Sequence, residues 1–133
     1  MTPFLRFAPL LARLFIAQLF LLSGYGKIVG FNQTAAAMAS KGLPFVEVLL
    51  VLTILIEIGG ALMILLGWKA RIGALALLLW MIPVTLIFHN FWAMSGQEAF
   101  INQIMFQKNL AIMGALLYVM AFGAGPYRVE TKE

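Results

Sequence analysis

Long apolar stretches separated by short polar segments dominate the hydrophobic pattern of this chain. Four of them are long enough for bilayer-crossing helices, over about residues 9–28, 45–67, 72–89 and 104–123. A helix of about 20 residues spans about 30 Å, the thickness of the hydrocarbon core. The pattern therefore predicts an all-α integral membrane bundle of four transmembrane helices, in a single domain over residues 1–133.

The first apolar stretch has two interpretations. Arg6 before an apolar run is typical of a signal peptide, whereas Pro9 suits the first turn of a retained helix. Arg13 and Lys27 interrupt the run, and no clear small-residue cleavage site follows it. The sequence therefore favours a retained transmembrane helix.

The polar segments between the spans have structure of their own. Residues 33–42 (QTAAAMASKG) are a candidate for a short amphipathic or interfacial helix that ends at Gly42. Pro83 predicts a kink in the third span. Residues 90–103 contain aromatic side chains suited to a membrane interface, and we expect them to form a connection rather than a helix.

Short loops predict that the four helices are antiparallel neighbours, with both termini on one side of the membrane. Most basic residues fall on or toward that side: Arg6, Arg13, Lys69, Arg71, Arg128 and Lys132. Three lysines fall toward the other side: Lys27, Lys41 and Lys108. The positive-inside rule therefore favours an N-in/C-in topology, with both termini in the cytoplasm.

Composition narrows the function classes. The chain is 63% hydrophobic and 11% charged, against about 45–50% and 25% in soluble domains, so lipid must cover part of its surface. The net charge is +4, but the basic residues are dispersed, which argues against nucleic-acid binding. The absence of cysteine excludes disulfides and thiol chemistry within the chain, and no metal-ligand spacing is present.

Glu57 is the least expected residue of the second span, because a carboxylate at mid-depth costs at least a few kcal/mol if charged and unpaired. Counted inward from the ends near Lys27 and Phe45, Arg13 and Glu57 lie at similar depths, roughly 21 and 18 Å. We therefore predict an Arg13–Glu57 ion pair facing the bundle interior. Such a pair suits either a structural clamp or a buried proton or ligand site.

A second polar set is expected at the opposite end of the bundle from the termini. It contains Lys27, Glu47, His89, Asn90, Lys108 and Asn109. His89 is the chain's only histidine, a residue type that titrates near neutral pH. These residues suit either contacts with lipid headgroups or an amphipathic ligand with an anionic or carbonyl head, such as a quinone.

Taken together, the order and spacing of several short motifs resemble the DoxX family of small four-helix membrane proteins. The motifs are Arg13, Ser23-Gly24-x-x-Lys27 with Gly30, Gly42-x-Pro44, Glu57-x-Gly59-Gly60 with Gly67, Phe88-His89-x-Phe91, and Lys108-Asn109. The resemblance implies a multi-pass protein of the bacterial inner membrane. It also implies a link to quinone or thiol-oxidant metabolism, because relatives include the membrane subunit of a thiosulfate:quinone oxidoreductase and partners of redox-defence enzymes.

The leading hypothesis is a quinone-associated component of membrane redox metabolism or of oxidant and quinone detoxification. On this hypothesis the chain has no intrinsic cofactor, binds a quinone or lipid, and serves as a subunit of a quinone-linked oxidoreductase if it is an enzyme. The alternative is a non-catalytic membrane anchor or scaffold for a redox enzyme. A small-molecule transporter is less favoured, because the expected pair of broken helices is absent. The expected partners are membrane lipid, a quinone, a redox enzyme and a second copy of the chain.

Overall fold

A computed structural model of the chain describes residues 2–130, which are helical throughout apart from short connections. The elements are α1 (Pro3–Val29), α2 (Phe31–Ser40), α3 (Val46–Leu66), α4 (Ala70–Phe88), the 3-10 helix η1 (Phe91–Ala93) and α5 (Gly96–Phe122). α1, α3, α5 and the α4–η1 segment are each long and apolar enough to cross a membrane. The all-α architecture with four candidate spans is therefore confirmed.

Two helices begin six or more residues before the start that the hydrophobic pattern predicts. α1 starts at Pro3, where Thr2 is the N-cap and its hydroxyl accepts a hydrogen bond from the Leu5 amide at 3.4 Å. The prediction that Pro9 lies in the first turn is wrong, because Pro3 occupies that position and Pro9 lies within the helix.

α5 starts at Gly96, eight residues before the predicted start at residue 104. Its first turns contain Gln97, Glu98 and Asn102, which lower the hydropathy of the segment without preventing a helix. The expected connection over residues 90–103 is therefore η1 followed by the start of α5. The predicted short helix after the first span is present as α2.

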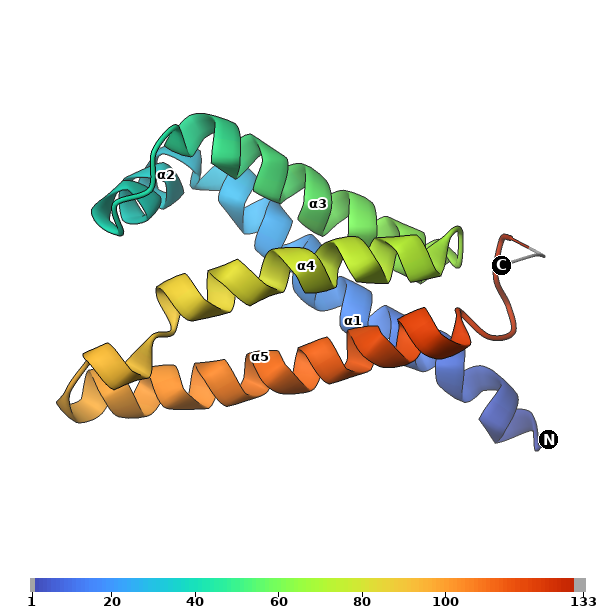
Figure 1. The fold of residues 1–133 in the computed structure, drawn as a ribbon. Helices are drawn as coiled ribbons and strands as arrows, with labels where there is room; N and C mark the ends of the chain where they lie inside the picture. The colour runs from blue at the N-terminus through green and yellow to red at the C-terminus, as the bar shows by residue number, and fades with distance from the viewer. Residues whose placement is uncertain (1, 131–133) are drawn as a thin grey trace.

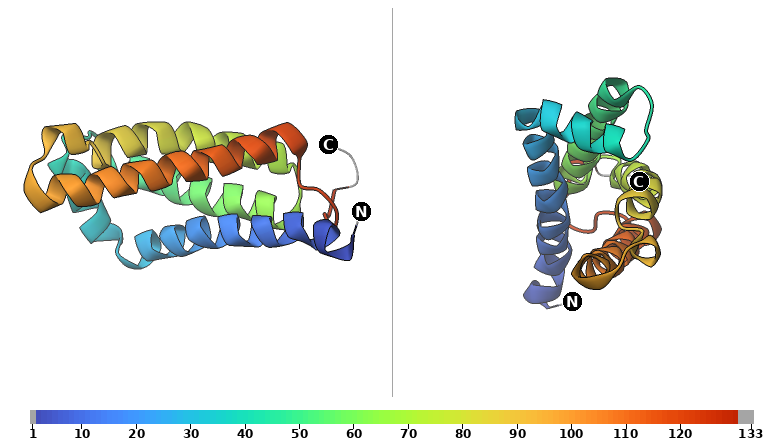
Figure 2. Two further views of the ribbon diagram at one scale, coloured as in Figure 1. Left: turned by 90° about the horizontal axis from the view of Figure 1, so that it is seen from below. Right: turned by 90° about the vertical axis from the view of Figure 1, so that its left-hand side faces the viewer.

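The spanning helices pack in chain order, α1 on α3, α3 on α4 and α4 on α5, while α2 lies against α1 and α3. Figures 1 and 2 show the described N- and C-terminal segments at one end of the bundle, here called the terminal end. α2 lies at the other end, here called the α2 end. Lys132 lies outside the described residues.

The chain after α5 closes the terminal end. It returns to the α3–α4 turn, where the Val129 amide donates to the Leu66 carbonyl at 2.9 Å. The Arg71 guanidinium donates to the Met120 and Ala121 carbonyls in the last turn of α5, a position where a cation also suits the helix dipole. These contacts fix the ends of α3, α4 and α5 to one another.

Near the terminal end, α3 and α4 approach closely through two glycines. An added Cβ at Gly73 would lie 2.9 Å from the Gly60 carbonyl oxygen, and one at Gly60 would lie 2.8 Å from Leu77 Cγ. The two helices separate toward the α2 end, as Figure 1 shows. Small residues at one end and divergence at the other produce a wedge-shaped space between α3 and α4.

This close approach gives the first testable prediction. Gly60→Ala should destabilise the fold, because the new methyl group overlaps Leu77, whereas a Cβ at Gly59 meets nothing within 4 Å. Both substitutions gain the same helix propensity, so their difference isolates the overlap. We expect Gly60→Ala to have a free energy of unfolding lower by about 1–3 kcal/mol than Gly59→Ala, measured by denaturation in mixed micelles. Equal stabilities would contradict the close packing.

Candidate functional site

The buried glutamate of α3 pairs with a lysine of α1. Glu57 Oε1 lies 2.7 Å from Lys27 Nζ, and the Glu57 side chain is fully buried. Its other oxygen, Oε2, is also buried and has no hydrogen-bond partner among residues 2–130. The Lys27 contact is therefore the main compensation for removing this carboxylate from water.

The predicted Arg13–Glu57 pair is wrong in its partner, and the register of α1 against α3 explains why. An added Cβ at Gly24 would lie 2.6 Å from Ile58 Cγ1 and 3.6 Å from Glu57 Cβ. Gly24 of α1 and Ile58 of α3 therefore lie at the same depth in the bundle, and the last turns of α1 lie beside Glu57. The sequence prediction assumed that the end of the first span and the start of the second lie at the same depth. In the structure, α3 extends about a dozen residues, or ~18 Å, beyond Ile58 toward the α2 end.

Arg13 instead belongs to the terminal end. Its Nη2 donates to the Tyr127 carbonyl at 2.8 Å, and its Nη1 lies beside Gly67, the left-handed residue that ends α3. The Arg13 side chain is only 2% exposed. It therefore joins α1 to the returning C-terminal segment. Arg13 is thus a structural clamp at the terminal end rather than beside Glu57.

The surroundings of Lys27 hold its ammonium in one position. Nζ donates to Ser23 Oγ at 2.6 Å and lies 5.7 Å from the centre of the Trp80 ring, within the range of a cation–π contact. Trp80 is itself fixed, because its Nε1 donates to Thr53 Oγ1 at 3.2 Å. An ammonium has three N–H donors, of which Glu57 and Ser23 take two. The third is available to the Trp80 face or to a ligand.

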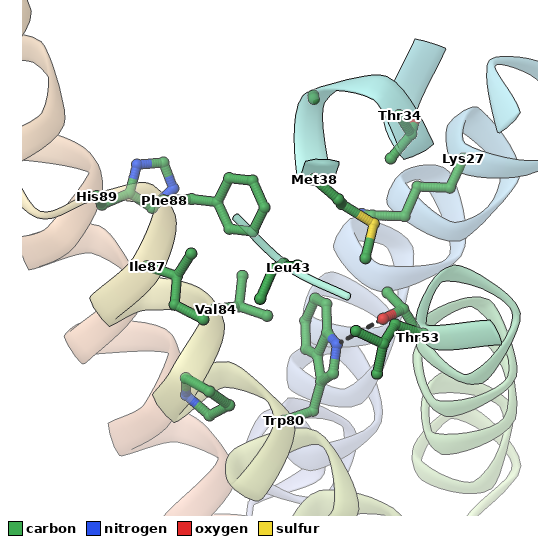
Figure 3. A pocket seen from close by; sticks show the side chains of 13 residues that line it. Lys27, Thr34, Met38, Leu43, Thr53, Trp80, Val84, Ile87, Phe88 and His89 are labelled. Atoms are coloured by element: carbon green, nitrogen blue, oxygen red, sulfur yellow. Dashed lines mark hydrogen bonds between the residues drawn. The ribbon is translucent and has the colours of Figure 1, made fainter. Parts of the chain in front are cut away.

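Lys27 lines a pocket of about 520 Å³ in the wedge between α3 and α4, at the α2 end. Residues of α1, α2, α3 and α4 form its walls, and Figure 3 shows Lys27 and His89 at opposite edges of it. The lining is mostly apolar: Ala37, Met38, Leu43, Leu49, Pro83, Val84, Ile87 and Phe88, with Thr34, Thr53 and Trp80. This is the size and character of a small-molecule site.

The predicted polar set is only partly brought together. Lys27 and His89 line the same pocket. Asn109 instead donates to Thr85 Oγ1 at 3.0 Å and joins α5 to α4. Glu47 and Lys108 are exposed and lie outside the pocket lining, and Asn90 follows His89 at the end of α4. Two of the six residues therefore form a common site.

Sequence reasoning missed the residues that position the site. Trp80 carried a signal, since an indole N–H in the middle of a span needs a partner, here Thr53. Asn102 was missed because residues 90–103 were not expected to be helical. Its Oδ1 lies 2.9 Å from His89 Nδ1.

Comparison with known proteins decides the family. The sequence profile of the DoxX family matches residues 8–90. The chain belongs to the DoxX family. It is 36% identical over 121 residues to inner membrane protein YqjF of Escherichia coli, covering 91% of the chain and 88% of YqjF. It is 30% identical over 123 residues to inner membrane protein YphA of the same organism, covering 92% and 88% of the two chains. No solved structure matches.

These matches, with the four candidate spans, make this DoxX-family chain a multi-pass inner-membrane protein. The two relatives match along most of the chain.

The ion pair gives the second prediction. Lys27→Met leaves a buried carboxylate without its cation, so the free energy of unfolding should fall by about 3–5 kcal/mol. Adding Glu57→Gln should recover part of that loss, giving coupling in a double-mutant cycle measured by denaturation in mixed micelles. Arg13→Ala with Glu57→Gln should be additive, because these side chains do not touch. Additive losses for Lys27 and Glu57, or coupling between Arg13 and Glu57, would contradict the assigned pair.

Proposed function

We propose that this DoxX-family protein binds a quinone in the pocket between α3 and α4, as a component of membrane redox metabolism. The observation that carries the proposal is a charged lysine, held by a buried glutamate, on the wall of an otherwise apolar cavity. A charge at this depth is costly, and intramembrane ionisable groups commonly mark substrate or ion sites. A structural clamp alone would not need a cavity beside it.

The pocket matches the chemistry of a quinone. A quinone oxygen accepts hydrogen bonds, and the Lys27 ammonium has a donor available for it. Reduction places negative charge on such an oxygen, which a fixed ammonium in an apolar site stabilises more strongly than the neutral carbonyl. Glu57 orients the ammonium through their 2.7 Å contact. The apolar walls contributed by Met38 and Val84, among others, suit the ring substituents and the first part of an isoprenoid tail.

Electrons for redox chemistry would come from a partner. The chain contains no cysteine, so no thiol of its own supplies them. A redox enzyme that docks on this protein is the partner class that the proposal requires. A membrane anchor or scaffold without a ligand is the competing function, and it makes no use of the pocket.

The third prediction tests ligand binding through Trp80, which lines the pocket. Trp68→Phe and Trp92→Phe together leave Trp80 as the only tryptophan. Titration with a quinone carrying a ten-carbon tail should quench Trp80 fluorescence saturably and raise the melting temperature. Val84→Phe, which fills the pocket, should weaken both effects at least about tenfold, as expected when ~1.4 kcal/mol of binding free energy is lost.

Leu79→Phe is the matched control, because Leu79 lies on the same helix but is 58% exposed and outside the pocket. It should bind as the parent does. Linear quenching that is equal in the Val84 and Leu79 variants, without a change in melting temperature, would mean that the quinone only partitions into the micelle. That result would leave the scaffold function favoured.

A further inference from the structure

The histidine at the far edge of the pocket is held by a hydrogen bond that determines its tautomer. His89 Nδ1 lies 2.9 Å from Asn102 Oδ1, on the first turns of α5. The orientation of the Asn102 amide is itself fixed, because its Nδ2 donates to the Glu98 carbonyl at 2.9 Å. A backbone carbonyl only accepts, so the amide nitrogen must face Glu98 and the amide oxygen must face His89.

The direction of the His89 bond follows from this. The Asn102 oxygen can only accept, so Nδ1 carries the hydrogen, and in the neutral imidazole Nε2 carries a lone pair. No hydrogen bond occupies Nε2 among residues 2–130, and His89 belongs to the pocket lining. Figure 3 shows its ring beside Phe88 at the edge opposite Lys27.

The pocket therefore has two poles of opposite kind. The Lys27 ammonium can only donate, whereas Nε2 of neutral His89 can only accept. We infer that the pocket selects the reduced form of its ligand, a hydroquinone, over the oxidised quinone; this rests on the quinone site proposed above. One hydroquinone oxygen accepts from Lys27, and the hydroxyl at the other end of the ring donates to His89 Nε2.

A quinone satisfies only one of these poles. Both of its oxygens are acceptors, so one can accept from Lys27 but neither can donate to Nε2. A site built to bind a hydroxyl discriminates against an analogue that lacks it, because a polar group of the site is left without its partner. Asn102 acts on this selectivity as a positioning residue, since it touches His89 and not the ligand.

The fourth prediction concerns the tautomer and needs no ligand. His89 is the only histidine, so protein labelled with ¹⁵N-histidine gives one pair of ring-nitrogen signals. At pH about 9, where a histidine side chain is ordinarily neutral, Nδ1 should be protonated and Nε2 unprotonated. Asn102→Leu should shift the proton toward Nε2, while Asn102→Asp, which keeps an accepting oxygen, should retain the Nδ1–H form. Gln103→Leu, at an exposed neighbouring position, is the control and should change nothing.

Finding Nε2–H in the parent protein would overturn the inference at this first step. The second step measures binding of a hydroquinone and its quinone with the same ten-carbon tail, under anaerobic conditions. The hydroquinone should bind about tenfold more tightly, the effect of one neutral hydrogen bond of roughly 1.4 kcal/mol. His89→Phe and Asn102→Leu should both remove this preference, whereas Asn102→Asp should keep it.

The outcomes separate the inference from the function on which it rests. Equal affinities for the two forms, or a preference that survives His89→Phe, would overturn the selectivity and leave the quinone site standing. Failure of both forms to bind would overturn the ligand class and the selectivity with it.

Discussion

The ion pair between Lys27 and Glu57 is the interaction on which the arrangement of this protein depends. A carboxylate that is fully buried in a membrane-spanning helix needs a cation close by, and the position of α1 against α3 supplies it as Lys27. That position places the end of α1 deep in the bundle. The following helix, α2, then lies over the remaining length of α3 and forms a wall of the pocket. Charge compensation and pocket formation thus have the same geometric cause.

Packing at the terminal end complements this arrangement. Gly60 and Gly73 let α3 and α4 touch, and the segment after α5 ties the helix ends together through Arg13 and Arg71. The divergence of α3 and α4 opens the pocket at the α2 end, where Pro83 also lines it. Close packing of α3 on α4 at one end and a wedge between them at the other give a small helical bundle room for a ligand.

Much of the fold could be predicted from the sequence, because runs of about 20 apolar residues have few alternatives to a spanning helix. The partner of Glu57 could not be predicted, because the relative depth of two residues depends on where their helices end. The end of α1 relative to α3 depends in turn on the packing of α2. The first turns of α5 were missed for a related reason: a helix that continues beyond the apolar layer has no hydropathy signal. Lys27 and His89 were predicted as part of a polar site, whereas Thr53 and Asn102 act through contacts that only the tertiary structure creates.

Solid-state NMR in lipid bilayers tests the central pairing most directly. Protein labelled with ¹⁵N at lysine Nζ and ¹³C at the glutamate carboxyl should show a short-range coupling, because Lys27 Nζ and Glu57 Oε1 are 2.7 Å apart. Lys27→Met should abolish that coupling, and Lys108→Met, at an exposed position, should leave it intact. A coupling that persists in Lys27→Met, or none in the parent protein, would contradict the ion pair and the pocket geometry derived from it.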